Sequence, residues 1–124
     1  MPNIDLRQRS FDLAVRIVRL CRYLDRQPGS TRALSAQLIR SGTSVGANVE
    51  EAQAGQSKAD FVCKMMIALK EARETCYWLR VLSASRTLPS AKISELQTEA
   101  EQIRNILGAI VVSTKKNLRS AGGD

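Results

Sequence analysis

Apolar residues recur at intervals of three and four along four long segments of this 124-residue chain. Because an α-helix turns by about 100° per residue, this spacing places them on one helical face. The segments cover about residues 6–26, 31–54, 58–86 and 91–118. Breaks at Pro28 and Pro89 separate them, and the alternation typical of strands is nowhere sustained. The sequence therefore predicts an all-α fold, an antiparallel up-down-up-down four-helix bundle, with residues 1–124 forming one domain.

The second segment carries small residues where a helix usually buries leucine or isoleucine. Ser41, Gly42 and Gly46 share an arc with Val45 and Val49. Each glycine in a helix interior costs about 1 kcal/mol relative to alanine, so we expect close contact with a neighbouring helix to offset that cost. The glycines lack the spacing of phosphate-binding loops, and no strand precedes them, which disfavours a phosphate site.

A polar strip borders this arc at helical spacing. It consists of Ser41, Ser44, Asn48 and Glu51. The favoured interpretation is a hydrogen-bonded strip at a boundary between two helices. The alternative is a site for a ligand or partner.

A motif extends from this strip into the third segment. Its residues are Gln37, Leu38, Arg40, Ser41, Ser44, Val45, Asn48, Val49, Glu51, Ser57, Lys58, Asp60, Phe61, Ile67, Ala68, Glu71, Glu74, Thr75 and Leu79. They resemble the central motif of the 23S ribosomal RNA intervening sequence protein family, which consists of four-helix-bundle proteins. The chain departs from the motif at 52–55, where many relatives have Glu-Gly directly. We interpret seven motif residues as structural: Arg40, Ser44, Asn48, Glu51, Phe61, Glu71 and Thr75.

The resemblance implies a ring-like homopentamer and carries over no catalytic residues. The role of this family is largely unestablished, which fits a scaffold or interaction protein. Some members are encoded inside insertions in 23S ribosomal RNA genes. The similar accessory variability proteins of diversity-generating retroelements work with a reverse transcriptase and nucleic acid. RNA or DNA is therefore a possible partner, beside further copies of the chain itself.

Apolar residues also occur outside the main helical stripes. The third segment has its main stripe at Phe61, Met65, Leu69, Ala72, Cys76, Leu79 and Leu82. A helix in a monomeric bundle needs only one buried face, so further apolar positions indicate self-association. The candidate interface residues are Phe11, Val15, Val18, Cys63, Ile67, Trp78 and Val81. The alternative is deep burial within one chain, with Trp78 in the core.

The chain carries a net charge of +7 with a pI near 9.8, which favours polyanionic partners. The candidate nucleic-acid-binding residues are Arg9, Arg16, Arg19, Arg22, Arg26, Lys115, Lys116 and Arg119. The alternative is a solvated basic face. Few aromatic side chains are present for base stacking, namely Tyr23, Tyr77 and Trp78.

Histidine is absent, which removes the commonest general base and the Glu-x-x-His pairs of di-iron bundles. Glu50, Glu51, Glu71 and Glu74 are the remaining carboxylate candidates for a metal or catalytic cluster. We expect Glu71 and Glu74 instead to pair with their helical neighbours Lys70, Arg73 and Arg80. We therefore expect no enzymatic activity, no cofactor, no metal and no small-molecule substrate.

The three cysteines, Cys21, Cys63 and Cys76, are odd in number and widely spaced. We expect three reduced, buried thiols, as in a cytoplasmic protein. No apolar run is long enough to cross a membrane, and the first fifteen residues do not resemble a signal peptide.

Overall fold

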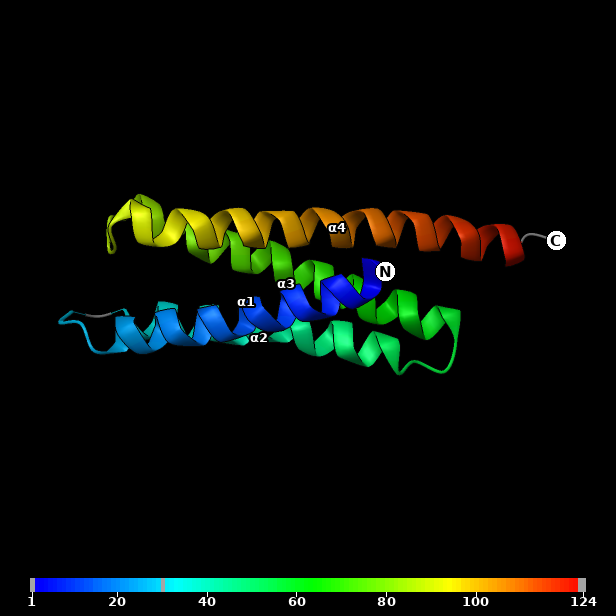
Figure 1. The fold of residues 1–124 in the computed structure, drawn as a ribbon, viewed down its shortest axis with the longest axis horizontal. Helices are drawn as coiled ribbons and strands as arrows, with labels where there is room; N and C mark the ends of the chain where they lie inside the picture. The colour runs from blue at the N-terminus through cyan, green and yellow to red at the C-terminus, as the bar shows by residue number, and fades with distance from the viewer. Residues whose placement is uncertain (1, 30, 123–124) are drawn as a thin grey trace.

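Four α-helices make up the computed structural model, which describes residues 2–29 and 31–122. They are α1 (Pro2–Asp25), α2 (Arg32–Gln53), α3 (Lys58–Ala84) and α4 (Ser90–Gly122). No strand occurs in these ranges, so the all-α prediction is confirmed. In Figure 1 the helices lie lengthwise beside one another, and short connections join them near the ends of the molecule.

The helix boundaries follow from local chemistry, with small departures from the predicted ones. Ser57 caps α3 as its sequence suggests, because its side chain accepts a hydrogen bond from the Asp60 backbone amide at 3.1 Å. Thr31 precedes α2 without such a bond. Gly29 has a φ of 107°, a conformation that glycine adopts readily, and lies in the connection after α1. Helices α1 and α4 both extend beyond their predicted ranges.

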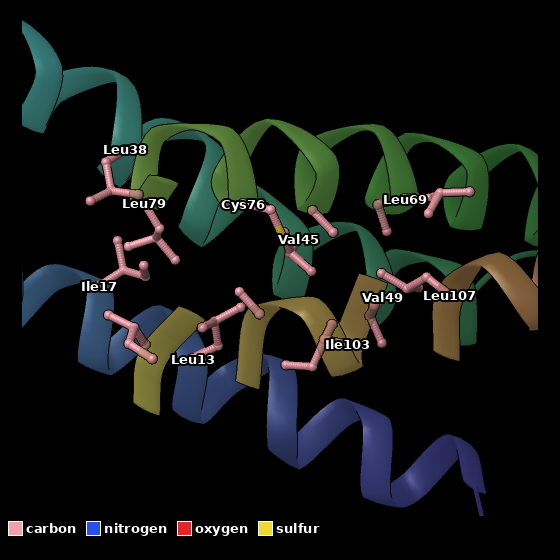
Figure 2. Close-up of a cluster of buried hydrophobic side chains, with 14 of the residues drawn as sticks. Leu13, Ile17, Leu38, Val45, Val49, Leu69, Cys76, Leu79, Ile103 and Leu107 are labelled. Carbon is pink, nitrogen blue, oxygen red and sulfur yellow. The ribbon is translucent and has the colours of Figure 1, made fainter. Parts of the chain in front are cut away.

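The core lies along the space that the four helices enclose. Figure 2 shows leucine, isoleucine and valine side chains from all four helices meeting there, together with Cys76. Leu13 and Ile17 come from α1, Val45 from α2, and Ile103 from α4. Helices α1 and α4 contact each other less extensively than the other neighbouring pairs, so the seam between them is the most open.

The glycines of α2 allow close contact with α1, as the small-residue arc predicted. A Cβ atom built on Gly42 would lie 2.8 Å from Cγ2 of the buried Ile17. One built on Gly46 would lie 3.1 Å from the backbone oxygen of Ser10. Larger residues would therefore push α1 and α2 apart, and packing offsets the low helix propensity of glycine.

Candidate functional site

The polar residues between α2 and α3 are largely occupied with holding these two helices together. Ser41 Oγ and Thr75 Oγ1 are fully buried and lie 3.0 Å apart. Each hydroxyl also lies within hydrogen-bond distance of a carbonyl oxygen of its own helix. Buried polar groups need such partners, so this pair satisfies itself and offers nothing to a ligand.

Arg40 joins α2 to two glutamates of α3. Its guanidinium lies 3.1 Å from Glu71 Oε2 and also pairs with Glu74. Trp78 Nε1 donates a hydrogen bond to Glu74 Oε2 at 3.1 Å, so the indole belongs to the same network.

The prediction that Glu71 and Glu74 pair with Lys70, Arg73 and Arg80 is wrong. Glu71 is only 8% exposed, because it lies on the side of α3 that packs against the bundle. The neighbouring cations of α3 are exposed and form no ion pair with either glutamate. The guanidinium that does reach it comes from α2.

The rest of the predicted polar strip makes local bonds. Asn48 donates to the backbone oxygen of Ser44 at 2.9 Å and lies 3.1 Å from its hydroxyl. The Glu51 side chain is exposed and makes no hydrogen bond or ion pair with a described residue, and Phe61 packs against the core. Only Ser41 of the strip bonds across to another helix, so the boundary interpretation holds for that residue alone.

The carboxylates do not assemble into a cluster. Glu50 forms an exposed ion pair with Arg7 at 2.7 Å, while Glu71 and Glu74 are engaged by Arg40. Within residues 2–29 and 31–122, no group of three or more His, Cys, Asp or Glu side chains could hold a metal ion.

Apolar side chains remain uncovered along α3 and the adjoining part of α4. A hollow of about 530 Å³, here called the α3/α4 groove, lies between these helices. It is lined by Ala59, Val62, Cys63, Met66, Ile67, Lys70, Arg73 and Leu118. Met66 and Ile67 are exposed, and Val112 nearby on α4 is 68% exposed. These side chains form a continuous apolar surface that a partner could cover.

The predicted interface residues divide into two classes. Phe11, Cys63 and Ile67 are exposed, whereas Val15, Val18, Trp78 and Val81 are half-buried. Trp78 packs against the core through its ring. Met66, Tyr77 and Val112 are also exposed, although the apolar pattern did not identify them as interface candidates. Each stands beside a buried or half-buried apolar residue, and such a doublet is the signal that could have identified them.

The cysteines are free thiols, but the expectation that all three are buried is wrong. Cys21 and Cys76 are buried, and this burial raises the pKa of both thiols. Cys63 is exposed and lines the α3/α4 groove, outside the buried stripe of α3.

The predicted basic residues differ in their surroundings. Arg9 binds Glu99 through two nitrogens at 3.0 and 2.8 Å, and this pairing lowers the pKa of the Glu99 carboxyl. Arg16 lies 3.9 Å from Glu95. Three further arginines are exposed and make no ion pair with a described residue: Arg19 and Arg22 on α1, and Arg26 directly after it.

Lys115, Lys116 and Arg119 are also exposed, but they lie near the C-terminal end of α4. The structure thus separates the two predicted basic segments toward opposite ends of the bundle.

Among the described residues, no helix contains an apolar stretch of the length that crossing a membrane requires.

Comparisons with known proteins agree with this architecture. A family model described as 23S rRNA-intervening sequence protein matches residues 2–109. A crystal structure of a protein with unknown function from the S23 ribosomal protein family of Bacteroides thetaiotaomicron VPI-5482 is 38% identical, with a TM-score of 0.83. The alignment covers 90% of this chain and 98% of that one. No curated protein matches the chain.

Proposed function

The chain belongs to the 23S rRNA-intervening sequence protein family, and from this premise we propose that it is a non-enzymatic scaffold that associates with copies of itself. The solved relative is described as having unknown function, so the proposal depends on the surfaces of this chain. Three of the four candidate carboxylates, Glu50, Glu71 and Glu74, are engaged by arginines, which supports a role without chemistry.

The uncovered apolar surface at the α3/α4 groove carries this proposal. Cys63, Met66 and Ile67 contact water along one side of α3, and Val112 does so on α4. Burial of apolar surface contributes about 25 cal/mol per Å², so covering this groove with another copy would stabilise an assembly.

We further propose an antiparallel up-down-up-down bundle that assembles as a closed ring of five. The short connections and the course of the chain in Figure 1 support the topology. Phe11 on α1 is 58% exposed and lies on a different surface from the α3/α4 groove. Contact between unlike surfaces generates rings where the rotation closes, whereas a two-fold dimer uses one surface twice. The number five comes from the family resemblance.

Light scattering coupled to size exclusion tests the assembly. We expect a mass that is a multiple of 13.7 kDa, and five times that mass for the proposed ring. The Ile67→Glu variant should shift the protein toward the monomer, because it places a charge in the groove. Ala36→Glu adds the same charge at an exposed position of α2 and should leave the mass unchanged. A wild-type protein that remains monomeric at micromolar concentration would refute the scaffold.

A second candidate function is binding of RNA or DNA. It is favoured by the exposed arginines of α1 that lack ion-pair partners among the described residues. Such contacts weaken steeply with salt, because binding releases counterions from the phosphates. A labelled RNA should therefore bind at roughly 50 mM salt and much less at roughly 200 mM. Absence of binding at the lower salt concentration would count against this function.

The proposal places the protein in the cytoplasm. Three free cysteines suit a reducing compartment, and the exposed Cys63 would oxidise readily elsewhere. Isolation of the protein from its source with Cys63 in a disulfide would contradict this location.

A further inference from the structure

A hollow of about 430 Å³ opens in the seam between α1 and α4, the helix pair with the least extensive contact. It is lined by Arg16, Arg19, Leu20, Tyr23, Lys92 and Leu96. Its volume lies within the range of roughly 300–1,000 Å³ that is usual for small-ligand sites. Leu96 is buried and Leu20 and Tyr23 pack against the core, so the hollow combines apolar walls with three cations.

The charge balance distinguishes this hollow from the rest of the seam. Elsewhere along the seam Arg9 is neutralised by Glu99, and both side chains are only 25% exposed. At the hollow, Arg16 approaches Glu95 at 3.9 Å, and the Glu95 side chain is 85% exposed. Solvent screens such a pair almost completely. Arg19 and Lys92 make no ion pair with a described residue, so the hollow keeps a net positive charge.

Tyr23 gives the hollow an aromatic surface. The Lys92 ammonium lies 4.7 Å from the centroid of the Tyr23 ring, a cation–π contact. Lysine has a long flexible side chain, so its ammonium can move from the ring to a nearby phosphate. The ring face would then be available to a planar base, and stacking on aromatic side chains is a common means of holding unpaired bases.

We propose that the α1/α4 hollow binds one base of a single-stranded nucleic acid together with an adjacent phosphate. Tyr23 provides the stacking surface, and Arg19 and Lys92 contact the phosphate. A duplex is a poorer ligand, because its bases are already stacked and paired. This inference rests on the second candidate function and names the place where the strand binds. A free nucleotide has the same chemistry, so the test must separate the two sources.

Fluorescence anisotropy of the full chain with a labelled oligouridine tests this site. Arg19→Ala combined with Lys92→Ala should weaken binding by at least about tenfold and lower the slope of log affinity against log salt by about 0.7, the value for one phosphate on a single strand. The matched control is Lys115→Ala with Lys116→Ala, which removes the same charge from the other part of α4 and should have a smaller effect. Equal losses of affinity in both double variants would overturn the α1/α4 hollow as the site. The second candidate function, binding of nucleic acid, would still stand.

Tyr23→Leu tests the stacking separately, since it keeps an apolar side chain but removes the ring. Binding of the single strand should fall by about fivefold or more, with the salt slope unchanged. An unchanged affinity, or a duplex that binds as tightly as the single strand, would overturn the assignment of Tyr23. Circular dichroism checks folding, and should Tyr23→Leu unfold, the exposed pair Arg19 and Lys92 still decides the question.

Calorimetry with adenosine monophosphate distinguishes the two ligand sources. Weak or absent binding of the mononucleotide beside clear binding of the strand supports the proposal as stated. Mononucleotide binding that depends on Arg19 and Lys92, without any binding of the strand, would overturn the second candidate function and show a nucleotide site instead. Failure of both ligands to bind would overturn the hollow as a site.

Discussion

Two glycines in helix interiors show that the space available to a side chain depends on the residues packed around it. A Cβ atom on Gly46 would lie 3.1 Å from the Ser10 backbone oxygen, whereas one on Gly108 would meet nothing within 4 Å. The backbone of α1 cannot move aside as a flexible side chain could. Gly46 therefore belongs to the close contact between α1 and α2, whereas the space beside Gly108 could hold a methyl group.

Alanine substitutions at these glycines should change stability in opposite directions. Gly46→Ala should lower the free energy of unfolding by about 1–3 kcal/mol, because the overpacking exceeds the gain in helix propensity. Gly108→Ala should raise it by about 1 kcal/mol, since only the propensity changes. Urea denaturation of both variants measures the difference. Stabilisation by both substitutions would show that α1 and α2 are less closely packed than the structure indicates.

At the scale of helices, ion pairs link both a loosely packed pair of helices and a closely packed one. Arg9 and Glu99 connect α1 to α4 across the most open seam, and Arg40 connects α2 to two glutamates of α3. The pairing with Arg9 lowers the pKa of Glu99 from its ordinary value of 4.5. A lowered carboxyl pKa means that the folded state binds the proton less readily than the unfolded state.

The Arg9–Glu99 pair should therefore make the α1–α4 seam sensitive to acid. Its contribution is present above about pH 4.5 and is lost as the pH falls below that value through the lower pKa of the folded state. After solvent screening we expect the contribution to be about 0.5–1 kcal/mol. Denaturation between about pH 5 and pH 3 should show a steeper loss of stability for the wild type than for Glu99→Gln.

Glu95→Gln provides the matched control for this prediction, because Glu95 lies one helical turn before Glu99 and approaches Arg16 only at 3.9 Å. That variant should keep the steep acid dependence of the wild type. Identical pH profiles for the wild type and Glu99→Gln would refute the role of this pair.

The helices were predictable from the sequence because each carries a long apolar stripe. Such a stripe can be recognised without knowing which helices pack against it. The Ser57 cap was predictable for the same reason, since it bonds within four residues. Contacts between helices were not. Glu71 has cations on its own helix and binds Arg40 from α2, a choice that depends on which face of α3 turns inward. The α1/α4 hollow depends on the spacing of two helices far apart in sequence.

For the whole molecule, the sequence indicated more apolar surface than one bundle can cover. The structure leaves Phe11, Ile67 and Val112 exposed on different helices. Trp78 is instead half-buried, with its indole nitrogen bonded to Glu74, because α3 turns that side toward α2. Periodicity identifies a second apolar face, but only the packed helices decide which of its members remain uncovered.

Cys63 offers a measurement of whether further copies cover this surface. It is the exposed thiol in the α3/α4 groove, whereas Cys21 and Cys76 are buried and burial raises their pKa. Alkylation of Cys63 should slow as the protein is concentrated, by about tenfold where only about a tenth of the grooves remain free.

The other two thiols should react slowly at every concentration. In the Ile67→Glu variant, which should not assemble, the alkylation rate of Cys63 should not depend on protein concentration. A Cys63 rate that does not change while light scattering shows the oligomer forming would place the contact elsewhere on the molecule. A thiol held in a packed interface cannot react with the reagent until the interface opens. An unchanged rate would therefore mean that the protein self-associates without using the α3/α4 groove.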